Sequence, residues 1–423
     1  MEPEPMLARF SLYGFLKNQR YFEPFLLLVF LERGLTYFDI GLLIAFREVT
    51  VILLEIPSGA VADVYGRRKS MVLSFLAYIT SFLVFGLAQQ LPLLFVAMFL
   101  FGMGEAFRTG THKAMIFAWL RLEGRLDERT KFYGYTRSWS KFGSAVSVLV
   151  AAVLVFVSGA YNTVFFFAIP PYVLGIVNFA GYPKELDERV EGRASLATVW
   201  RHMSRALVAS LKYAKLRRLL LESMGFEGVF HAVKDYIQPV LTAAAAVTVA
   251  GYVVVEDWTE PQQAVLLVAP VYLALYLLSG VASRRAHVLA NATGGEDRAA
   301  LFVWGSAVVV FTGLALAAFY EVFAVVIAAF VCLHVLQNLW RPILISRLDA
   351  HGGEFQGATL LSVESQSRRM ATMVVAPLIG LAVDAAAARG TGGAFWPIGV
   401  LGGMVTLGFF VTSWNGKART ATP

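Results

Sequence analysis

Residues 55–69 read EIPSGAVADVYGRRK and connect two long apolar segments of the chain. Gly59 allows a neighbouring helix to approach closely, and Asp63 can cap the positive N-terminus of a facing helix. Gly66 permits a tight turn. The basic cluster at 67–69 is of the kind that stays on the cytoplasmic side of a membrane. The stretch therefore predicts a tight cytoplasmic turn between two membrane-spanning helices.

Apolar segments lie on both sides of this turn. Of the 423 residues, 57% are hydrophobic and 15% are charged, whereas soluble domains average about 25% charged residues. A helix that spans a bilayer requires about 20 predominantly apolar residues. Residues 243–258 are also apolar, and we interpret them as an outer loop or interfacial segment; if they span, one further helix is added. Twelve segments have spanning length: 12–33, 38–62, 70–89, 92–113, 135–158, 162–181, 218–242, 263–282, 299–318, 321–344, 359–384 and 394–413.

This composition excludes a disordered chain and disfavours a water-soluble enzyme. The sequence contains no Walker loop, no glycine-rich dinucleotide motif and no paired metal-ligand spacing. Its single cysteine, Cys332, excludes an internal disulfide and a multi-cysteine metal site. We therefore expect neither an enzyme nor a bound cofactor or metal.

The basic residues indicate the orientation of the chain. They gather in the even-numbered loops, at 67–69, 121–131, 184–217 and 284–298. Because cytoplasmic loops retain Lys and Arg, both termini are predicted to lie in the cytoplasm, with the protein in a bacterial inner membrane. The same rule explains the net charge of +7 without a nucleic-acid partner. The N-terminus lacks the basic region of a cleavable signal, so the first helix is expected to remain.

A polar, basic loop divides the chain into two halves. Residues 183–217 form this cytoplasmic linker, with a predicted amphipathic helix over 194–212. Six spans precede it in residues 1–182, and six follow it in residues 218–423. A weaker copy of the first turn, GVASR at 280–284, follows span eight. Two parallel six-helix repeats are one known plan of secondary transporters.

The turn at 55–69, its weaker copy and the six-plus-six arrangement resemble the major facilitator superfamily. The resemblance implies an all-α integral membrane protein with twelve transmembrane helices in two six-helix pseudo-repeats. It also implies a gating loop that locks the outward-open state, formed by Gly59, Asp63, Gly66, Arg67 and Arg68.

Two departures weaken an assignment to drug/proton exchange. Phe117-Ala118 occupies the place of a Tyr-Asp pair found in members with a similar lead-in. The Gly/Pro-rich signature of many antiporters is not evident at 143–155.

Ionisable residues within the spans carry the functional information, because such residues at membrane depth usually face a polar cavity or pair with one another. At 100° per residue, several groups share one helical face and predict a central polar cavity. Glu364 and Arg368 are four residues apart, the spacing of an ion pair. The groups on common faces are Glu227, His231, Lys234, Asp235 and Gln238; Glu105, Arg108 and His112; His334, Asn338 and Arg341; and Glu48 and Glu55.

Individual roles follow from residue type. Glu23 precedes Pro24, which can open the helix, and its carboxylate can couple protons or pair with Arg20. The proton-coupling candidates are Glu23, Asp235, Glu227 and His231. The substrate-cavity candidates are Arg20, Glu48, Glu105, Arg108, Arg341, Asn338 and Glu364.

The basic residues have alternative roles. Arg108 and Arg341 can bind anions through their planar forks or neutralise carboxylates such as Glu105. We interpret Arg137, Arg368 and Arg369 as gate ion pairs or snorkelling side chains rather than ligands. Lys113 is placed beyond the hydrocarbon.

These observations predict a secondary active transporter that moves a charged or zwitterionic small molecule by alternating access. Protons are the expected coupling ion, and efflux is favoured by analogy with the Glu-x-Pro-Ser-Gly lead-in. The alternatives are an organic-anion importer, and a lipid translocator or non-transporting membrane protein on the same fold. The expected partners of this monomer are a small-molecule substrate, a proton or other coupling ion, and membrane lipids.

Overall fold

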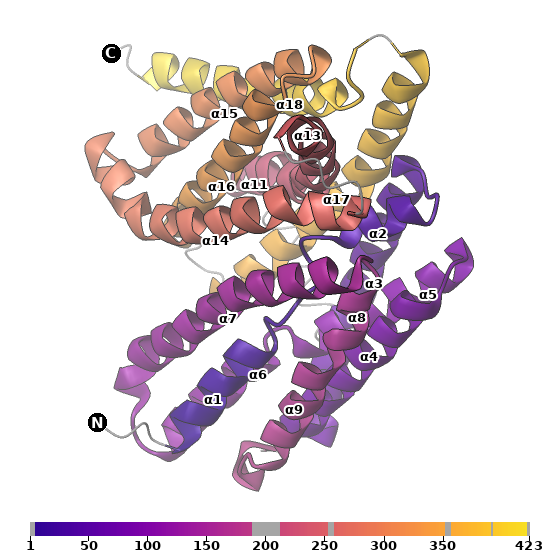
Figure 1. The fold of residues 1–423 in the computed structure, drawn as a ribbon. Coiled ribbons are helices and arrows are strands. Elements are labelled where there is room, and N and C mark those ends of the chain that lie inside the picture. The colour runs from indigo at the N-terminus through magenta and orange to yellow at the C-terminus, as the bar shows by residue number, and fades with distance from the viewer. Residues whose placement is uncertain (1–4, 188–211, 253–257, 352–356, 391, 421–423) are drawn as a thin grey trace. The chain divides into compact units, whose positions relative to one another are not determined.

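The computed structural model describes residues 5–187, 212–252, 258–351, 357–390 and 392–420. The described chain consists of helices and connecting turns, without strands (Figure 1). Nine helices within this described part are long and apolar enough to cross a membrane. The predicted all-α fold with twelve transmembrane helices is confirmed, with several spans built from two or more consecutive helices.

The first six spans comprise eleven helical elements. Span six is interrupted before Pro170-Pro171, because a new helix begins at Ile169 with proline in its first turn. The elements are α1 (Pro5–Leu16), α2 (Leu26–Glu32), α3 (Tyr37–Tyr65), α4 (Arg67–Leu87), α5 (Leu91–Arg108), α6 (Thr111–Leu122), η1 (Leu126–Glu128), α7 (Arg129–Ser158), α8 (Thr163–Phe167), α9 (Ile169–Ala180) and η2 (Lys184–Asp187).

The last six spans follow residue 211. Our interpretation of 243–258 as a separate loop is wrong for its first part, because α13 continues to Tyr252. The amphipathic helix predicted over 194–212 falls outside the described residues except at its last position. The elements are α11 (Ala214–Ser223), η3 (Met224–Gly228), α12 (Val229–Val233), η4 (Lys234–Tyr236), α13 (Ile237–Tyr252), α14 (Glu260–Ala292), α15 (Glu296–Phe319), α16 (Phe323–His351), α17 (Gly357–Arg389) and α18 (Trp396–Thr420).

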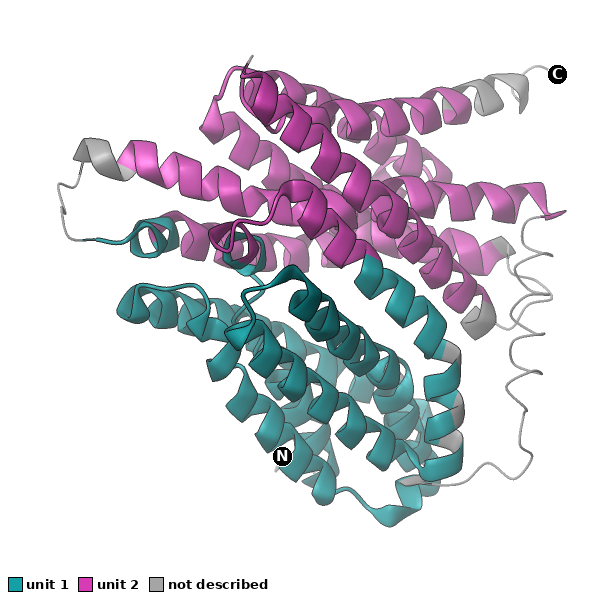
Figure 2. Ribbon diagram, turned by 90° about the vertical axis from the view of Figure 1, so that its right-hand side faces the viewer, with its two compact units in different colours: residues 1–29, 46–201, 258–265 teal, residues 30–45, 202–257, 266–423 magenta. Residues whose placement is uncertain are grey.

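The chain forms two compact units (Figure 2). Unit 1 comprises residues 1–29, 46–201 and 258–265, and unit 2 comprises residues 30–45, 202–257 and 266–423. Helix α3 therefore begins in unit 2 and continues in unit 1, while α14 begins in unit 1. The sequence-based division at 182 and 218 remains a prediction.

Aromatic side chains form the core of unit 1, where α4 packs against α5, α8 and α9. The ring of Tyr172 lies 4.9 Å from that of Phe75 and 5.0 Å from that of Phe82. The hydroxyl of Ser74 donates a 2.6 Å hydrogen bond to the carbonyl of Gly104. Small and hydroxyl-bearing residues thus allow α4 and α5 to approach closely, as is usual between membrane helices.

Indole rings form the core of unit 2, where α15 packs against α16 and α18. Trp304 and Trp340 are fully buried, with ring centroids 5.2 Å apart. Phe409 stacks on Trp304 at 4.8 Å. In the same unit, the backbone N–H groups of Tyr37 and Phe38 donate to the carboxylate of Asp384 at 3.1 and 2.8 Å. Asp384 of α17 thus caps the positive start of α3.

The structure tests part of the predicted gating loop. The tight turn is confirmed, because α3 ends and α4 begins on either side of Gly66, whose φ of 100° strongly favours glycine. Arg68 donates a 3.1 Å hydrogen bond to the carbonyl of Tyr182. The described residues show no close approach at Gly59, because a Cβ there would meet none of their atoms within 4 Å. The Asp63 side chain lies outside the described part.

Candidate functional site

The helix of span one is broken between Leu16 and Leu26. Residues 17–25 form turns in which the N–H of Glu23 donates to the carbonyl of Arg20 at 2.9 Å. Pro24 has no N–H and its ring obstructs a continuous helix, so the predicted opening at this proline is confirmed. Non-helical backbone at membrane depth is tolerated where protein buries it or where it lines a watery cavity.

Span four is also broken, between Arg108 at the end of α5 and Thr111 at the start of α6. Gly110 has a φ of 81° there, a conformation that favours glycine. Our phase argument for Glu105, Arg108 and His112 assumed a continuous helix and is therefore wrong. Arg108 and His112 nevertheless line one cavity, whereas Glu105 is not among its lining residues.

This cavity lies within unit 1 among α1, the break in span four, α6 and α7, and its volume is about 420 Å³. Five of its lining residues are basic, and none is acidic. The basic residues come from three parts of the chain and are Lys17, Arg108, Lys113, Arg137 and Lys141.

Close contact between α1 and α7 shapes the cavity. A Cβ on Gly14 would lie 2.7 Å from the Ser140 hydroxyl, and one on Gly143 would lie 2.7 Å from the Phe15 carbonyl. The buried amide of Gln19 donates to the Gly143 carbonyl at 3.2 Å. Glycine is therefore required on both helices for their backbones to meet.

Aromatic residues support the cavity from behind. The Tyr13 ring stacks on His112 at 3.7 Å, and the Tyr182 hydroxyl lies 3.3 Å from His112 Nε2. Tyr182 follows the end of α9, and burial raises the pKa of its phenol above its usual value. This phenol therefore remains neutral. On the other side, the Tyr172 hydroxyl donates to the Lys17 carbonyl at 3.0 Å and fixes the break in span one.

The five basic side chains have few compensating partners. Arg108 Nε donates a long 3.4 Å hydrogen bond to the Tyr78 hydroxyl. The Lys113 ammonium lies 5.3 Å from the ring centroid of Tyr133, and the Lys17 ammonium lies 5.5 Å from that of Tyr13. In the described chain, none of the five basic cavity residues forms an ion pair with a carboxylate.

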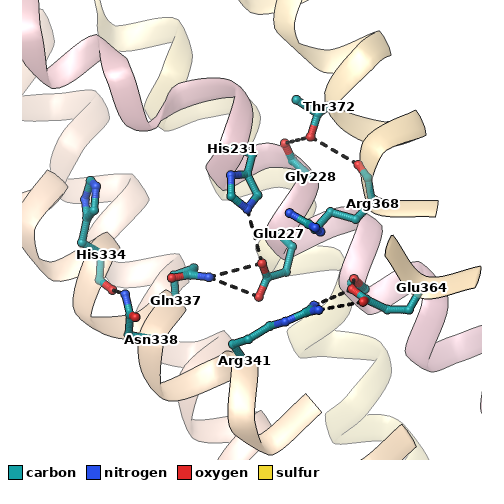
Figure 3. Close-up of polar contacts among 11 residues, drawn as sticks. Glu227, Gly228, His231, His334, Gln337, Asn338, Arg341, Glu364, Arg368 and Thr372 are labelled. Carbon is teal, nitrogen blue, oxygen red and sulfur yellow. Dashed lines mark hydrogen bonds and ion pairs between the residues drawn. The ribbon is translucent and has the colours of Figure 1, made fainter. Parts of the chain in front are cut away.

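A second polar cluster surrounds Glu227 in unit 2 (Figure 3). Glu227 lies in the π-helical turn η3 and is only 1% exposed. The Gln337 amide donates to its two carboxylate oxygens at 3.3 and 3.4 Å, and His231 Nε2 lies 3.7 Å from Oε2. π-Helical turns frequently occur at functional sites. The structure thus brings two predicted coupling residues together.

Asp235, a third predicted coupling residue, has another environment. It lies in the 3₁₀ turn η4, where its carboxylate forms a 2.8 Å ion pair with Lys234. Gln238 of the same predicted stripe is fully buried and donates to the Tyr272 hydroxyl at 2.9 Å. The alternation of π, α and 3₁₀ turns disrupts the single helical face that the sequence predicted.

Our predicted pairing of Glu364 with Arg368 is wrong. Glu364 accepts hydrogen bonds from both terminal nitrogens of Arg341, at 2.6 and 2.9 Å, and a short one from the Ser223 hydroxyl (Figure 3). This bidentate pair satisfies the Arg341 fork that the sequence offered as an anion ligand. Arg368 lies beside Glu227, and its Nε has no hydrogen-bond partner among the described residues.

The remaining predicted cavity residues are dispersed. Glu48 is buried against its neighbour Arg47, with a 2.6 Å ion pair. The Asn338 amide donates to the His334 carbonyl one turn earlier on α16. Arg20 and Glu23 both lie in the turns that interrupt span one.

Sequence reasoning missed or undervalued several residues. Lys17 and Lys141 were assigned no role, although the break at Pro24 signalled that Lys17 borders irregular backbone. Glu222 was not singled out, yet it is buried between Arg218 and Arg347, with ion pairs of 2.9 and 2.6 Å. The four-residue spacing of Arg218 and Glu222 carried that signal.

Similar folds occur among solved transporters. A structure of the nucleoside transporter NupG matches with a TM-score of 0.76 and 10% identity, covering 97% of this chain and 99% of that one. A D-xylose-proton symporter matches at 0.68 with 13% identity and 96% coverage of both chains. A POT family transporter in complex with 5-aminolevulinic acid matches at 0.70 with 15% identity, covering 97% and 96%.

At these identities the structural likeness shows the fold alone. The family assignment rests on the sequence, because the pattern of one family matches residues 18–363, a range that includes the turn at 55–69 and the discontinuous span four. The chain belongs to the Major Facilitator Superfamily.

Proposed function

We propose that this protein is a secondary active transporter that moves a small charged molecule by alternating access. The observation that carries the proposal is the basic cavity of about 420 Å³, which lies where two spanning helices are interrupted. In secondary transporters, discontinuous helices commonly form the substrate site. We therefore assign substrate binding to this cavity, with Arg108 as a predicted ligand. Two further substrate-cavity candidates are near lining residues in the sequence: Arg20 is close to Lys17, and Glu105 is close to Arg108.

We further propose that protons drive the transport and that Glu227 takes them up. Glu227 is buried beside His231 and Arg368, so uptake of a proton by its carboxylate would change the charge balance of this cluster. The distance of 3.7 Å between His231 Nε2 and the Glu227 carboxylate supports a role for His231 as the proton relay. Glu23 and Asp235 are the other coupling candidates.

The direction of transport and the placement in the membrane belong to the same proposal. A proton antiporter would export the substrate, as the lead-in of the turn at 55–69 suggests, whereas the basic cavity supports the alternative of an organic-anion importer. One structurally similar protein is described as a proton symporter.

The basic loops support cytoplasmic termini in a bacterial inner membrane. We propose that the protein works as a monomer.

Transport by purified protein in liposomes tests this function. The liposomes enclose a pH-sensitive dye, and charged metabolites, drugs and lipids are added outside. Substrate-dependent proton movement is expected, and its sign separates antiport from symport. Glu227→Gln should abolish gradient-driven movement while sparing exchange, with Glu128→Gln in the half-exposed turn η1 as the control. A variant that accumulates substrate normally would exclude Glu227 as the coupling group.

The turn at 55–69 is proposed to act as the gate. Asp63→Asn should shift the population of inward- and outward-open states, as read by cysteine probes on both faces. The single native thiol is exposed, so Cys332→Ser provides the background. Unchanged labelling on both faces would argue against a gate formed by Gly59, Asp63, Gly66, Arg67 and Arg68.

Lipid transport is the second candidate. The exposed leucine and valine side chains of the described helices suit contact with lipid, and they do not discriminate between the two functions. A lipid-flip assay in the same liposomes separates them. Lipid movement without any small-molecule transport would replace the proposed function.

A further inference from the structure

We propose that the substrate is a dianion, a small molecule that carries two negative charges on phosphate or carboxylate groups, and that the basic cavity of unit 1 binds it. This inference rests on the proposed function and names its substrate class. It stands on the charge, size and hydrogen-bonding character of the cavity.

The first argument is the surplus of positive charge. Two carboxylates act electrostatically on the cluster: Glu105 on Lys17 and Arg108, and Glu23 on Lys141. Five basic residues line the cavity, Arg20 lies in the adjoining break of span one, and no acidic residue is among the lining residues, so basic groups outnumber acidic ones here. Like charges held together in a partly dry site repel one another, and an anionic ligand relieves this repulsion.

A monoanion would leave most of this surplus uncompensated. A dianion can contact several basic groups at once, since they surround the cavity from the turn after α1, the end of α5, α6 and α7. Arg108 and Arg137 offer planar forks that match phosphate and carboxylate oxygens. Lys17, Lys113 and Lys141 add compact point charges.

The second argument concerns hydrogen bonds. Gly110 and His112 of the α6 start line the cavity, and the N-cap residue of this helix is Gly110, which offers no side-chain cap. The N–H groups of this helix start can therefore add to the basic side chains in binding an anion. The hydroxyls of Thr136, Ser140 and Ser144 donate to carbonyls of their own helix. Their lone pairs remain to accept from ligand hydroxyls.

The third argument is size. A volume of about 420 Å³ is typical of a site for a small metabolite, since ligand pockets span about 300–1,000 Å³. The cavity suits a compact phosphate ester or dicarboxylate and is too small for an intact phospholipid with two acyl chains.

Binding to the purified full-length chain tests the inference independently of transport. The probes are inorganic phosphate, glycerol phosphate and succinate, with acetate as a monoanion and D-xylose as a neutral control. We expect at least one dianion to raise the melting temperature and to give a measurable Kd by calorimetry. The affinity should fall with added salt, because the interaction is ionic.

Paired variants assign the binding to the cavity. Lys141→Met and Arg137→Gln should each weaken dianion binding by about 10- to 100-fold, the usual loss for a charged hydrogen bond. Each should also raise the melting temperature of the ligand-free protein, because each removes a repelling charge. Lys131→Met on the same helix is the control, since its side chain is 73% exposed and should leave both readings unchanged.

Each outcome decides between the claims. No binding of any dianion by folded protein overturns the inference, as does transport of a neutral or cationic substrate that dianions do not inhibit. Variants that lower the ligand-free melting temperature without changing Kd would show that other groups of the chain neutralise the basic cavity residues. This result would also overturn the inference. Dianion binding without transport would instead refute the proposed function. A preference for phosphate or for succinate would show which type of dianion the cavity binds.

Discussion

Replacing Arg341 by methionine separates a structural ion pair from a substrate ligand. In the structure the Arg341 guanidinium donates two hydrogen bonds to Glu364, at 2.6 and 2.9 Å. The Glu364 side chain is fully buried. Arg341→Met fills similar space but leaves that carboxylate with the Ser223 hydroxyl as its remaining partner in the described chain. The variant should therefore be strongly destabilised.

The expected magnitude follows from the burial of the Glu364 carboxylate. Removing one partner of a buried ion pair costs about 3–5 kcal/mol, because the other charge is left uncompensated. For a domain of about 200 residues each kcal/mol lowers the melting temperature by roughly 2–4 °C. Arg341→Met should therefore melt on the order of 10 °C lower. The double variant Arg341→Met, Glu364→Leu should recover most of this loss, because neither charge remains.

Thermal unfolding of purified protein in detergent, followed by tryptophan fluorescence, gives all four corners of this double-mutant cycle. Lys131→Met provides the comparison, because its partner Glu128 lies in an exposed pair worth about 0–1 kcal/mol. A single variant that melts like the parent but no longer binds substrate would refute the structural role. It would restore Arg341 as the anion ligand that the sequence suggested.

Three further predictions use the same preparation. Glu227→Gln should lose pH-driven accumulation and keep substrate counterflow; loss of both would indicate a binding or folding defect instead. Gly143→Val should lower the melting temperature and weaken substrate binding, because the valine side chain would overlap the Phe15 backbone. A fully active variant would show that α1 and α7 can move apart without loss of transport. Asp384→Ala removes the cap on α3 and should lower the free energy of unfolding by about 1 kcal/mol. This loss should appear as a drop of a few degrees in melting temperature, which Asp384→Asn partly restores. Equal stability of all three proteins would contradict the capping role.

The fold was accessible from the sequence because membrane insertion is governed by local composition. A run of about 20 apolar residues spans a bilayer wherever it occurs. Special residues mark the irregular points in the same local way: Gly66 at the tight turn, Pro24 at the break in span one and Pro170 at the start of α9. The error at 243–252 has the same origin, since an apolar stretch without a polar boundary does not show where its helix ends.

The site was only partly accessible. Helical periodicity identified Glu227 and His231 as neighbours on one face, and the structure places them 3.7 Å apart. It failed for Glu364 and Arg368, whose spacing allowed a pair that Arg341 of another helix forms instead. Periodicity fixes which residues of one helix point together, and it carries no information on which helix lies opposite.

The sequence by itself determined the twelve spans, their basic loops and the breaks that proline and glycine impose, because each depends on neighbouring residues. Only the tertiary structure decided that Lys17, Arg108 and Lys141 share one cavity. Their distance in the chain says nothing of their distance in space. That distance depends on the rotation and close packing of α1 against α7, which small residues at the contact permit and local patterns cannot specify.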